Sequence, residues 1–99
     1  MPEHPLKIFE RIDPELRKSV QSNNDFTFAD GALPKKIKFL IAMALDAAHG
    51  TSDGVKSLAG QAMQAGATRE QVMEALRVAC YISGVGTVYT AARVFKEMF

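Results

Sequence analysis

The stretch Pro34–Gly50, "PKKIKFLIAMALDAAHG", decides the fold of this 99-residue chain. It begins with proline, which suits the first position of a helix, and it ends with glycine, which commonly follows one. After Lys38 it is apolar on nearly every side, as expected for a helix surrounded by other helices. The apolar part is far shorter than a bilayer-spanning helix and contains Asp46. We therefore predict a central helix of a bundle and no membrane span.

Three further helices are predicted downstream. The segment Asp53–Ala65 carries apolar residues at helical spacing. Thr68 and Gln71 have the spacing of a capping box, so the next helix is expected to begin at Arg69. The glycine-containing turn Ser83–Gly86 then leads into a last helix. We assign the apolar side of that helix to Val85, Val88, Tyr89, Ala92, Phe95 and Phe99.

The N-terminal third predicts one helix and one loop. Asp13 followed by Pro14 is typical of a helix start, and this helix is expected to span about 13–21. The polar segment 22–34 is expected to be a loop packed down by Phe26 and Phe28. No segment alternates with a period of two, so no strand is predicted. The fold class is therefore all-α, with about five helices in a single compact domain over 1–99.

Composition limits the classes of molecule that this chain is expected to bind. Twelve Lys and Arg against eleven Asp and Glu give a net charge of +1 without a dense basic stripe, which argues against nucleic acid. A chain this small and 47% hydrophobic gains stability by burying helix faces between subunits, so we expect a homo-oligomer. Cys80 is the only cysteine and the start is charged and proline-rich, which favours the cytoplasm over a secreted or membrane protein.

The order of these features resembles the carboxymuconolactone decarboxylase family, which includes the alkylhydroperoxidase D proteins. The segments that carry the resemblance are "AGAT", "REQVMEAL" and "ACYISGVGTVYTAARV" within about 33–95. It implies an alkylhydroperoxidase D-like bundle, with the family core over about 33–99. It also implies lactone decarboxylase or peroxidase activity, and trimers or hexamers with pockets at subunit contacts.

Family members with peroxidase activity have a C-x-x-C pair, a histidine four residues later and a glutamate on the preceding helix. By the resemblance these positions fall on Thr51 and Gly54, Leu58 and Phe39 in this chain. Thiol peroxidase chemistry needs a thiolate and a proton carrier, and these residues provide neither. The decarboxylase branch also has a histidine at the position of Leu58. The sequence therefore argues against the thiol route and supports neither enzyme class by its motif.

Other residues near this loop are candidates for chemistry. His49 is interpreted as a helix C-terminal residue or, alternatively, as a general base oriented by Asp46 one turn earlier. Thr51 and Ser52 are expected to cap the next helix. The alternative is a small anion, such as a substrate carboxylate, at that helix start. Its binding residues would be Thr51, Ser52, Gly54, Val55 and Lys56, although Asp53 weakens this interpretation.

Cys80 is interpreted as a small apolar core residue, with a one-cysteine peroxidatic centre near His49 as the alternative. His4 and His49 have no partner at metal-ligand spacing, so neither a metal nor another cofactor is expected. Three functions stay open: a divergent enzyme acting on a small lactone, acid or peroxide; a module that binds a small molecule without turnover; and a structural subunit.

Overall fold

The computed structural model describes residues 4–99, which are all-helical, as predicted. A 3₁₀ turn, η1 (Pro5–Lys7), precedes six helices, and no strand occurs in this range. The short α1 makes the number of helices one greater than the five expected. The helices are α1 (Ile8–Ile12), α2 (Pro14–Phe28), α3 (Lys35–Ala48), α4 (Ser52–Gln64), α5 (Arg69–Ser83) and α6 (Gly86–Met98).

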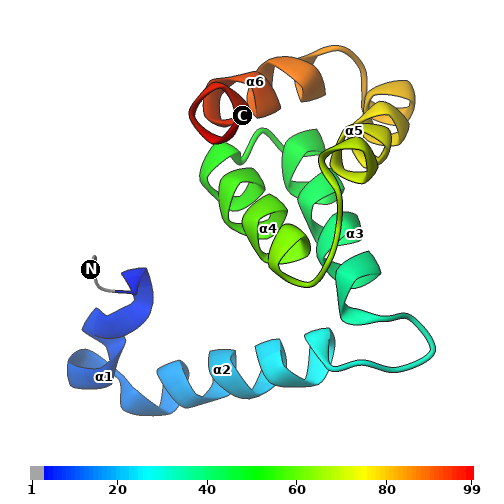
Figure 1. Cartoon of the computed structure of the whole chain (residues 1–99). Coiled ribbons are helices and arrows are strands. Elements are labelled where there is room, and N and C mark those ends of the chain that lie inside the picture. Colours follow the sequence, from blue (N-terminus) through cyan, green and yellow to red (C-terminus); the bar gives the residue numbers. More distant parts are fainter. Residues whose placement is uncertain (1–3) are drawn as a thin grey trace.

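Helices α3 to α6 form a bundle, and η1, α1 and α2 form an arm that projects from it (Figure 1). As predicted, α3 is central and contacts α4, α5 and α6. Met43, Val55 and Val72 are fully buried where these helices meet. Alanines fill much of the remaining core, which lets the helix axes approach closely. The buried alanines are Ala47, Ala59, Ala62, Ala67, Ala79 and Ala91.

The arm differs from the prediction, because α2 continues to Phe28 and does not end near Gln21. Side chains one turn apart bond to each other along the solvent-facing helix: the Gln21 amide donates to Asp25 at 2.8 Å. Such pairs compensate for the low helix propensity of the intervening asparagines. Only the segment 29–34 is left to link the arm to α3.

The two phenylalanines expected to pack behave differently. Phe28 stacks on Phe39 of the core, with ring centroids 4.7 Å apart and planes 18° from parallel. The side chain of Phe26 is 83% exposed, so its predicted packing is wrong. Because α2 is helical here, residues two positions apart point to different sides, and only one of the two rings can face the bundle.

Of the six residues expected on the apolar side of the last helix, Phe95 is half-buried and packs against the core, and the other five are exposed. The residues of α6 that the bundle buries are Thr87, Thr90, Ala91 and Val94. Thr90 can be buried because its hydroxyl donates to the carbonyl of Gly86 at 3.0 Å. The exposed part of the expected stripe includes Val85, Val88 and Tyr89. Helix α6 is therefore apolar on two sides, and the chain itself covers only one of them.

Two local predictions about the turns are confirmed. Thr68 and Gln71 form the capping box at the start of α5, with side-chain to backbone distances of 3.1 and 3.0 Å. The glycines that end α3 and α5, Gly50 and Gly84, have φ angles of +81° and +92°, which favour glycine. Within residues 4–99, no helix has the length and apolarity needed to cross a membrane.

Candidate functional site

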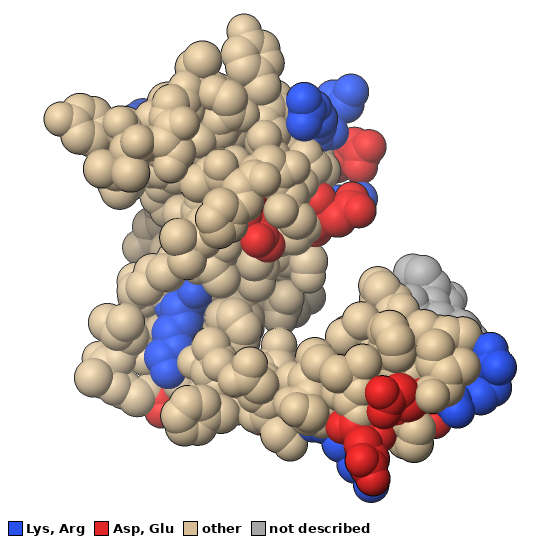
Figure 2. Space-filling view, turned by 180° about the vertical axis from the view of Figure 1, so that it is seen from behind, with Lys and Arg blue, Asp and Glu red and all other residues tan. Residues whose placement is uncertain are grey.

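A groove of about 420 Å³ lies between the arm and the bundle. Figure 2 shows the molecule hollowed where the arm leaves the bundle. One wall comes from η1 and α2, and the other from α3 and α4. The residues that line it are His4, Leu6, Arg17, Val20, Gln21 and Asn24 on the arm, and Asp46, Gly54, Ser57, Leu58 and Gln61 on the bundle.

Asp46 and Gly54 meet on the bundle wall. A Cβ atom added to Gly54 would collide with the Asp46 carboxylate, at 2.7 Å from its Cγ. The carboxylate therefore occupies the space into which a side chain at position 54 would extend. Gly54 lies in the first turn of α4, where the positive end of the helix dipole interacts favourably with a carboxylate. By the family resemblance, members with peroxidase activity have a cysteine at position 54, and in this chain the Asp46 carboxylate fills the adjoining space.

The other three positions of the missing motif do not form a cluster of polar groups. Leu58 lines the groove and packs against the core. Phe39 is only 7% exposed and lies under the ring of Phe28. Thr51 is exposed at the start of α4. The positions that correspond to the peroxidase motif are therefore partly exposed and partly apolar, and Asp46 is the carboxylate beside them.

The arm wall carries a cation that sequence analysis did not identify. The guanidinium of Arg17 donates through Nη1 to the Gln21 side chain at 3.1 Å. Its Nε atom is buried and has no hydrogen-bond partner among residues 4–99. Asn24 lies on the same side of α2, because seven residues make two helical turns. This spacing was visible in the sequence, but the wall that these side chains face was not.

His49 does not face the groove. It ends α3, where its backbone N–H donates to the carbonyl of Leu45 at 3.0 Å, and it is exposed. Among the described residues, no hydrogen bond or ion pair joins His49 to Asp46, and the groove lining does not include His49. The pairing of Asp46 with His49 stays a prediction, and the groove brings Asp46 together with Arg17 instead.

Two side-chain interactions connect the start of α4 to α6. The Ser52 hydroxyl donates to the carbonyl of Thr90 at 3.0 Å, and Lys56 forms an ion pair with Glu97 at 3.1 Å. Thr51 is the N-cap residue, but within residues 4–99 its side chain makes no capping hydrogen bond. The capping interpretation of Thr51 is therefore wrong, and Ser52 has a different partner from the one expected.

These contacts also bear on the anion site predicted at this helix start. The N–H of Val55 already donates to the carbonyl of Thr51 at 3.1 Å. The side chain of Lys56 is directed to Glu97, and the carboxylates of Asp46 and Asp53 make the surroundings negative. An anion at Gly54 would meet these charges without a free cation beside it. Anion binding at Thr51, Ser52, Gly54 and Lys56 stays a prediction, and the geometry favours the arm wall for a negative group.

Cys80 lies outside the groove between the arm and the bundle. It is half-buried on α5 and lines a hollow of about 360 Å³ together with Met73, Leu76, Arg77 and Val88. The cation beside this hollow is Arg77, not His49.

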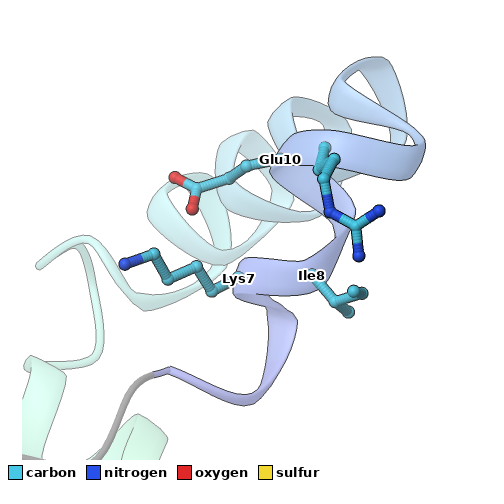
Figure 3. Close-up of a pocket in the computed structure, with 4 residues that line it drawn as sticks. Lys7, Ile8 and Glu10 are labelled. Atoms are coloured by element: carbon cyan, nitrogen blue, oxygen red, sulfur yellow. The ribbon is translucent and has the colours of Figure 1, made fainter.

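The arm carries a further hollow of about 480 Å³ at Lys7, Ile8, Glu10 and Arg11 (Figure 3). There Lys7 and Glu10 extend to one side and Ile8 to the other, so the labelled side chains do not converge on a ligand.

Residues 4–99 contain no group of three or more His, Cys, Asp or Glu side chains that could hold a metal ion. Asp46 on the bundle wall and Arg17 on the arm wall are the charged residues that define the groove.

Comparison with known proteins agrees with this architecture. The family model "Carboxymuconolactone decarboxylase family" matches residues 14–97. The apo crystal structure of a carboxymuconolactone decarboxylase family protein from Legionella pneumophila is similar, with a TM-score of 0.85 and 34% sequence identity. The match covers 92% of this chain and 81% of that one. Among curated proteins no match is found.

The family match extends over α2 as well as the bundle, so it includes the arm wall of the groove as far as Pro14. It therefore begins well before the core expected from the sequence resemblance, which started at about residue 33. Because the model match spans most of the chain and the similar structure has the same fold, the chain belongs to the carboxymuconolactone decarboxylase family.

Proposed function

We propose that this chain binds a small organic acid in the groove between arm and bundle and does not reduce peroxides through a thiol. The observation that carries the proposal is the position of Arg17 on the wall of this groove, with a buried Nε atom that has no hydrogen-bond partner among residues 4–99. The absence of cysteine and histidine from positions 51, 54 and 58 supports the second half of the proposal.

The chemistry of Arg17 favours a carboxylate ligand. A guanidinium has five N–H donors, and Gln21 accepts a bond only from Nη1. A carboxylate can bind the free edge with two parallel bonds, which are stronger than bonds between neutral groups. Leaving Nε buried without an acceptor costs about 1–3 kcal/mol. A ligand that enters between α2 and α4 supplies the missing acceptor.

The rest of the groove suits a small ligand. Its volume of about 420 Å³ lies within the range typical of small-molecule sites. Val20 and Leu58 supply apolar surface from the two walls, and Ser57 and Gln61 supply hydrogen-bonding groups from α4. The Asp46 carboxylate repels a second negative charge. A monocarboxylic acid therefore suits the groove better than a dicarboxylic acid.

A divergent enzyme is the second candidate. It is favoured by Asp46, whose carboxylate lies against Gly54 and faces the groove. In this function Asp46 acts as the general base: it takes a C–H proton from the carbon beside a carbonyl group of the bound acid or lactone and returns it to the product. Lone Cys80 in a chain of this composition supports a cytoplasmic setting for either function.

Calorimetric titration tests the binding proposal. The probes are short monocarboxylic acids and their uncharged amides. We expect saturable binding of at least one acid, and a loss of affinity of about tenfold or more in Arg17→Gln, because a bond to a charged group contributes about 1.5–3 kcal/mol. Arg11→Gln, on the exposed part of the arm, is the matched control and should bind as the wild type does.

The two candidate functions respond differently to Asp46→Asn. In the binding function this variant binds the acid as tightly or more tightly, because a like charge is removed. In the enzymatic function it binds the acid but loses turnover. Amides that bind as well as acids, or Arg17→Gln with unchanged affinity, would show that the proposal is wrong.

A further inference from the structure

The groove between the arm and the bundle carries opposite charges on its two walls. Arg17 supplies a cation from α2, and Asp46 supplies an anion from α3. His4 is the other titratable residue of the described lining, and its Nδ1 accepts from the backbone N–H of Leu6 at 3.1 Å. A ring nitrogen that accepts a hydrogen bond carries no proton, so His4 adds no positive charge in this arrangement. The described lining therefore holds one positive and one negative group.

These two charges are not neutralised within residues 4–99. Arg17 and Asp46 form no ion pair with each other in this range. The Asp46 carboxylate accepts no hydrogen bond from another described residue, and Gln21 is the one described partner of the Arg17 guanidinium. Both side chains are half-buried, so solvent screens their charges less than it screens charges on an open surface. Two opposite charges thus line one groove, each with unused hydrogen-bonding capacity.

The Asp46 carboxylate is held in place by the backbone of α4. A Cβ atom added to Gly54 would lie 2.7 Å from Asp46 Cγ, so the carboxylate lies directly against the first turn of this helix. This contact limits the rotamers that Asp46 can adopt. A side chain that is already ordered loses less conformational entropy when a ligand binds to it. Asp46 is therefore a preorganised acceptor on the bundle wall.

Hydrogen-bonding capacity also differs between the two walls. On the bundle wall, Gln61 donates its side-chain amide to the Ser57 hydroxyl at 3.1 Å. The side-chain carbonyl of Gln61 has no donor among residues 4–99 and can accept from a ligand beside Asp46. On the arm wall, the Gln21 oxygen accepts from Arg17, whose remaining N–H groups are donors. The bundle wall therefore offers acceptors and the arm wall offers donors.

A ligand that satisfies both walls has a negative group at one end and a positive group at the other. A dicarboxylic acid would place a second carboxylate against Asp46, and a diamine would place an ammonium group against Arg17. An uncharged molecule would leave both side chains without a charged partner. A carboxylate and an ammonium group in one small molecule match the two walls. This combination of groups defines an amino acid.

We propose that the groove binds amino acids as zwitterions, with the carboxylate on Arg17 and the ammonium group on Asp46. This inference rests on the proposed function, whose ligand class it narrows from organic acids to acids that also carry an amino group. Arg17 holds both kinds of acid, whereas Asp46 selects those with an ammonium group. The inference belongs to the binding function, because a carboxylate engaged by an ammonium group is not free to act as a base.

Calorimetric titration with a homologous series tests this inference. The probes are glycine, β-alanine and their longer homologues up to aminohexanoic acid, each with its amino group at the end opposite the carboxylate. Each is compared with its N-acetylated form and with the unsubstituted acid of equal length. At least one amino acid should bind about tenfold more tightly than both of its counterparts, because a hydrogen bond between charged groups contributes that factor or more. The chain length that binds most tightly reports the spacing between Arg17 and Asp46.

Asp46→Asn should abolish this preference. Asparagine keeps the shape of the side chain and removes its charge, so the amino acid should lose about tenfold in affinity. The unsubstituted acid should bind this variant at least as tightly as the wild type, which also shows that the variant is folded. Asp53→Asn is the matched control, because Asp53 lies in the same turn of α4 but is exposed and does not line the groove. It should keep the full preference.

Failure of this inference can be distinguished from failure of the proposed function. Amino acids that bind no more tightly than unsubstituted acids would overturn the inference alone. The same holds for a preference that Asp46→Asn keeps or that Asp53→Asn abolishes. Unchanged affinity of Arg17→Gln for the unsubstituted acids, or a wild type that binds neither kind of probe, would overturn the proposed function and the inference together.

Discussion

The Asp46 carboxylate lies where a side chain at position 54 would be, and it fits there because Gly54 has no side chain. By the family resemblance, this is a cysteine position in members with peroxidase activity. The local chemistry is therefore that of a carboxylate at a helix start and not that of a dithiol. The two residues come from different helices, α3 and α4, so their relationship also fixes how closely these helices approach.

Replacing Gly54 by alanine measures the energetic cost of this close approach. In the interior of a helix, Gly→Ala usually stabilises by about 0.5–1 kcal/mol. At Gly54 the new Cβ forces Asp46 out of its rotamer, which costs about 1 kcal/mol and cancels the gain. Gly60→Ala, on the same helix with no described atom within 4 Å of the added Cβ, should give the full gain. Urea unfolding measures both free energies.

A double-mutant cycle separates the collision from other effects. In an Asp46→Ala background the carboxylate is gone, so Gly54→Ala should be more stabilising than in the wild-type background, although the remaining contact with Thr51 Cγ2 at 3.3 Å keeps the gain below that of Gly60→Ala. Equal gains at the two glycines in the wild-type background would contradict the observed contact.

The stacking of Phe28 on Phe39 is expected to hold the arm against the bundle. Phe28→Ala removes a pair worth about 0.5–1.5 kcal/mol beyond its buried area. Faster amide exchange along α2 and weaker acid binding in the groove should follow, because Arg17 loses its position. Phe26→Ala, two residues earlier and 83% exposed, is the matched control. Exchange that accelerates equally in both variants would show that the ring contact does not hold the arm.

Ser52 links the start of α4 to α6 through its bond to the carbonyl of Thr90. Ser52→Ala should reduce the free energy of unfolding by about 1 kcal/mol, because a partly buried acceptor loses its donor. The Lys56–Glu97 pair is more than half exposed on both sides, and Lys56→Ala should cost less than Ser52→Ala. Thermal unfolding of the two variants measures which one loses more stability. A larger loss in Lys56→Ala would show that the ion pair contributes more than the Ser52 hydrogen bond.

Thiol chemistry is expected to be absent. Hydroperoxide consumption by the wild type should not exceed that of an ordinary protein thiol, and Cys80→Ser should lower it only to the background. The reason is that Cys80 lies outside the groove and has no second cysteine to resolve a sulfenic acid. Enzyme-like turnover, whether lost or kept in Cys80→Ser, would contradict the interpretation of positions 51, 54 and 58.

Much of the helix order could be predicted, because the signals act over a few residues. The capping box joins Thr68 to a residue three positions away, and glycines such as Gly84 end helices through their own φ angle. The end of α2 was missed because bonds such as Gln21 to Asp25 let polar residues continue a helix that composition alone would end. Periodicity on α6 could not decide which apolar side the bundle would bury.

The sequence by itself determined the helical class, the starts of α2 and α5 and the lack of a dithiol. Each of these depends on residue identity or on neighbours within one helical turn. Only the tertiary structure decided that Asp46 approaches Gly54, that Arg17 faces the same groove and that His49 does not. These relationships depend on how separate helices pack, and that packing follows from the burial of the whole core and not from any local pattern.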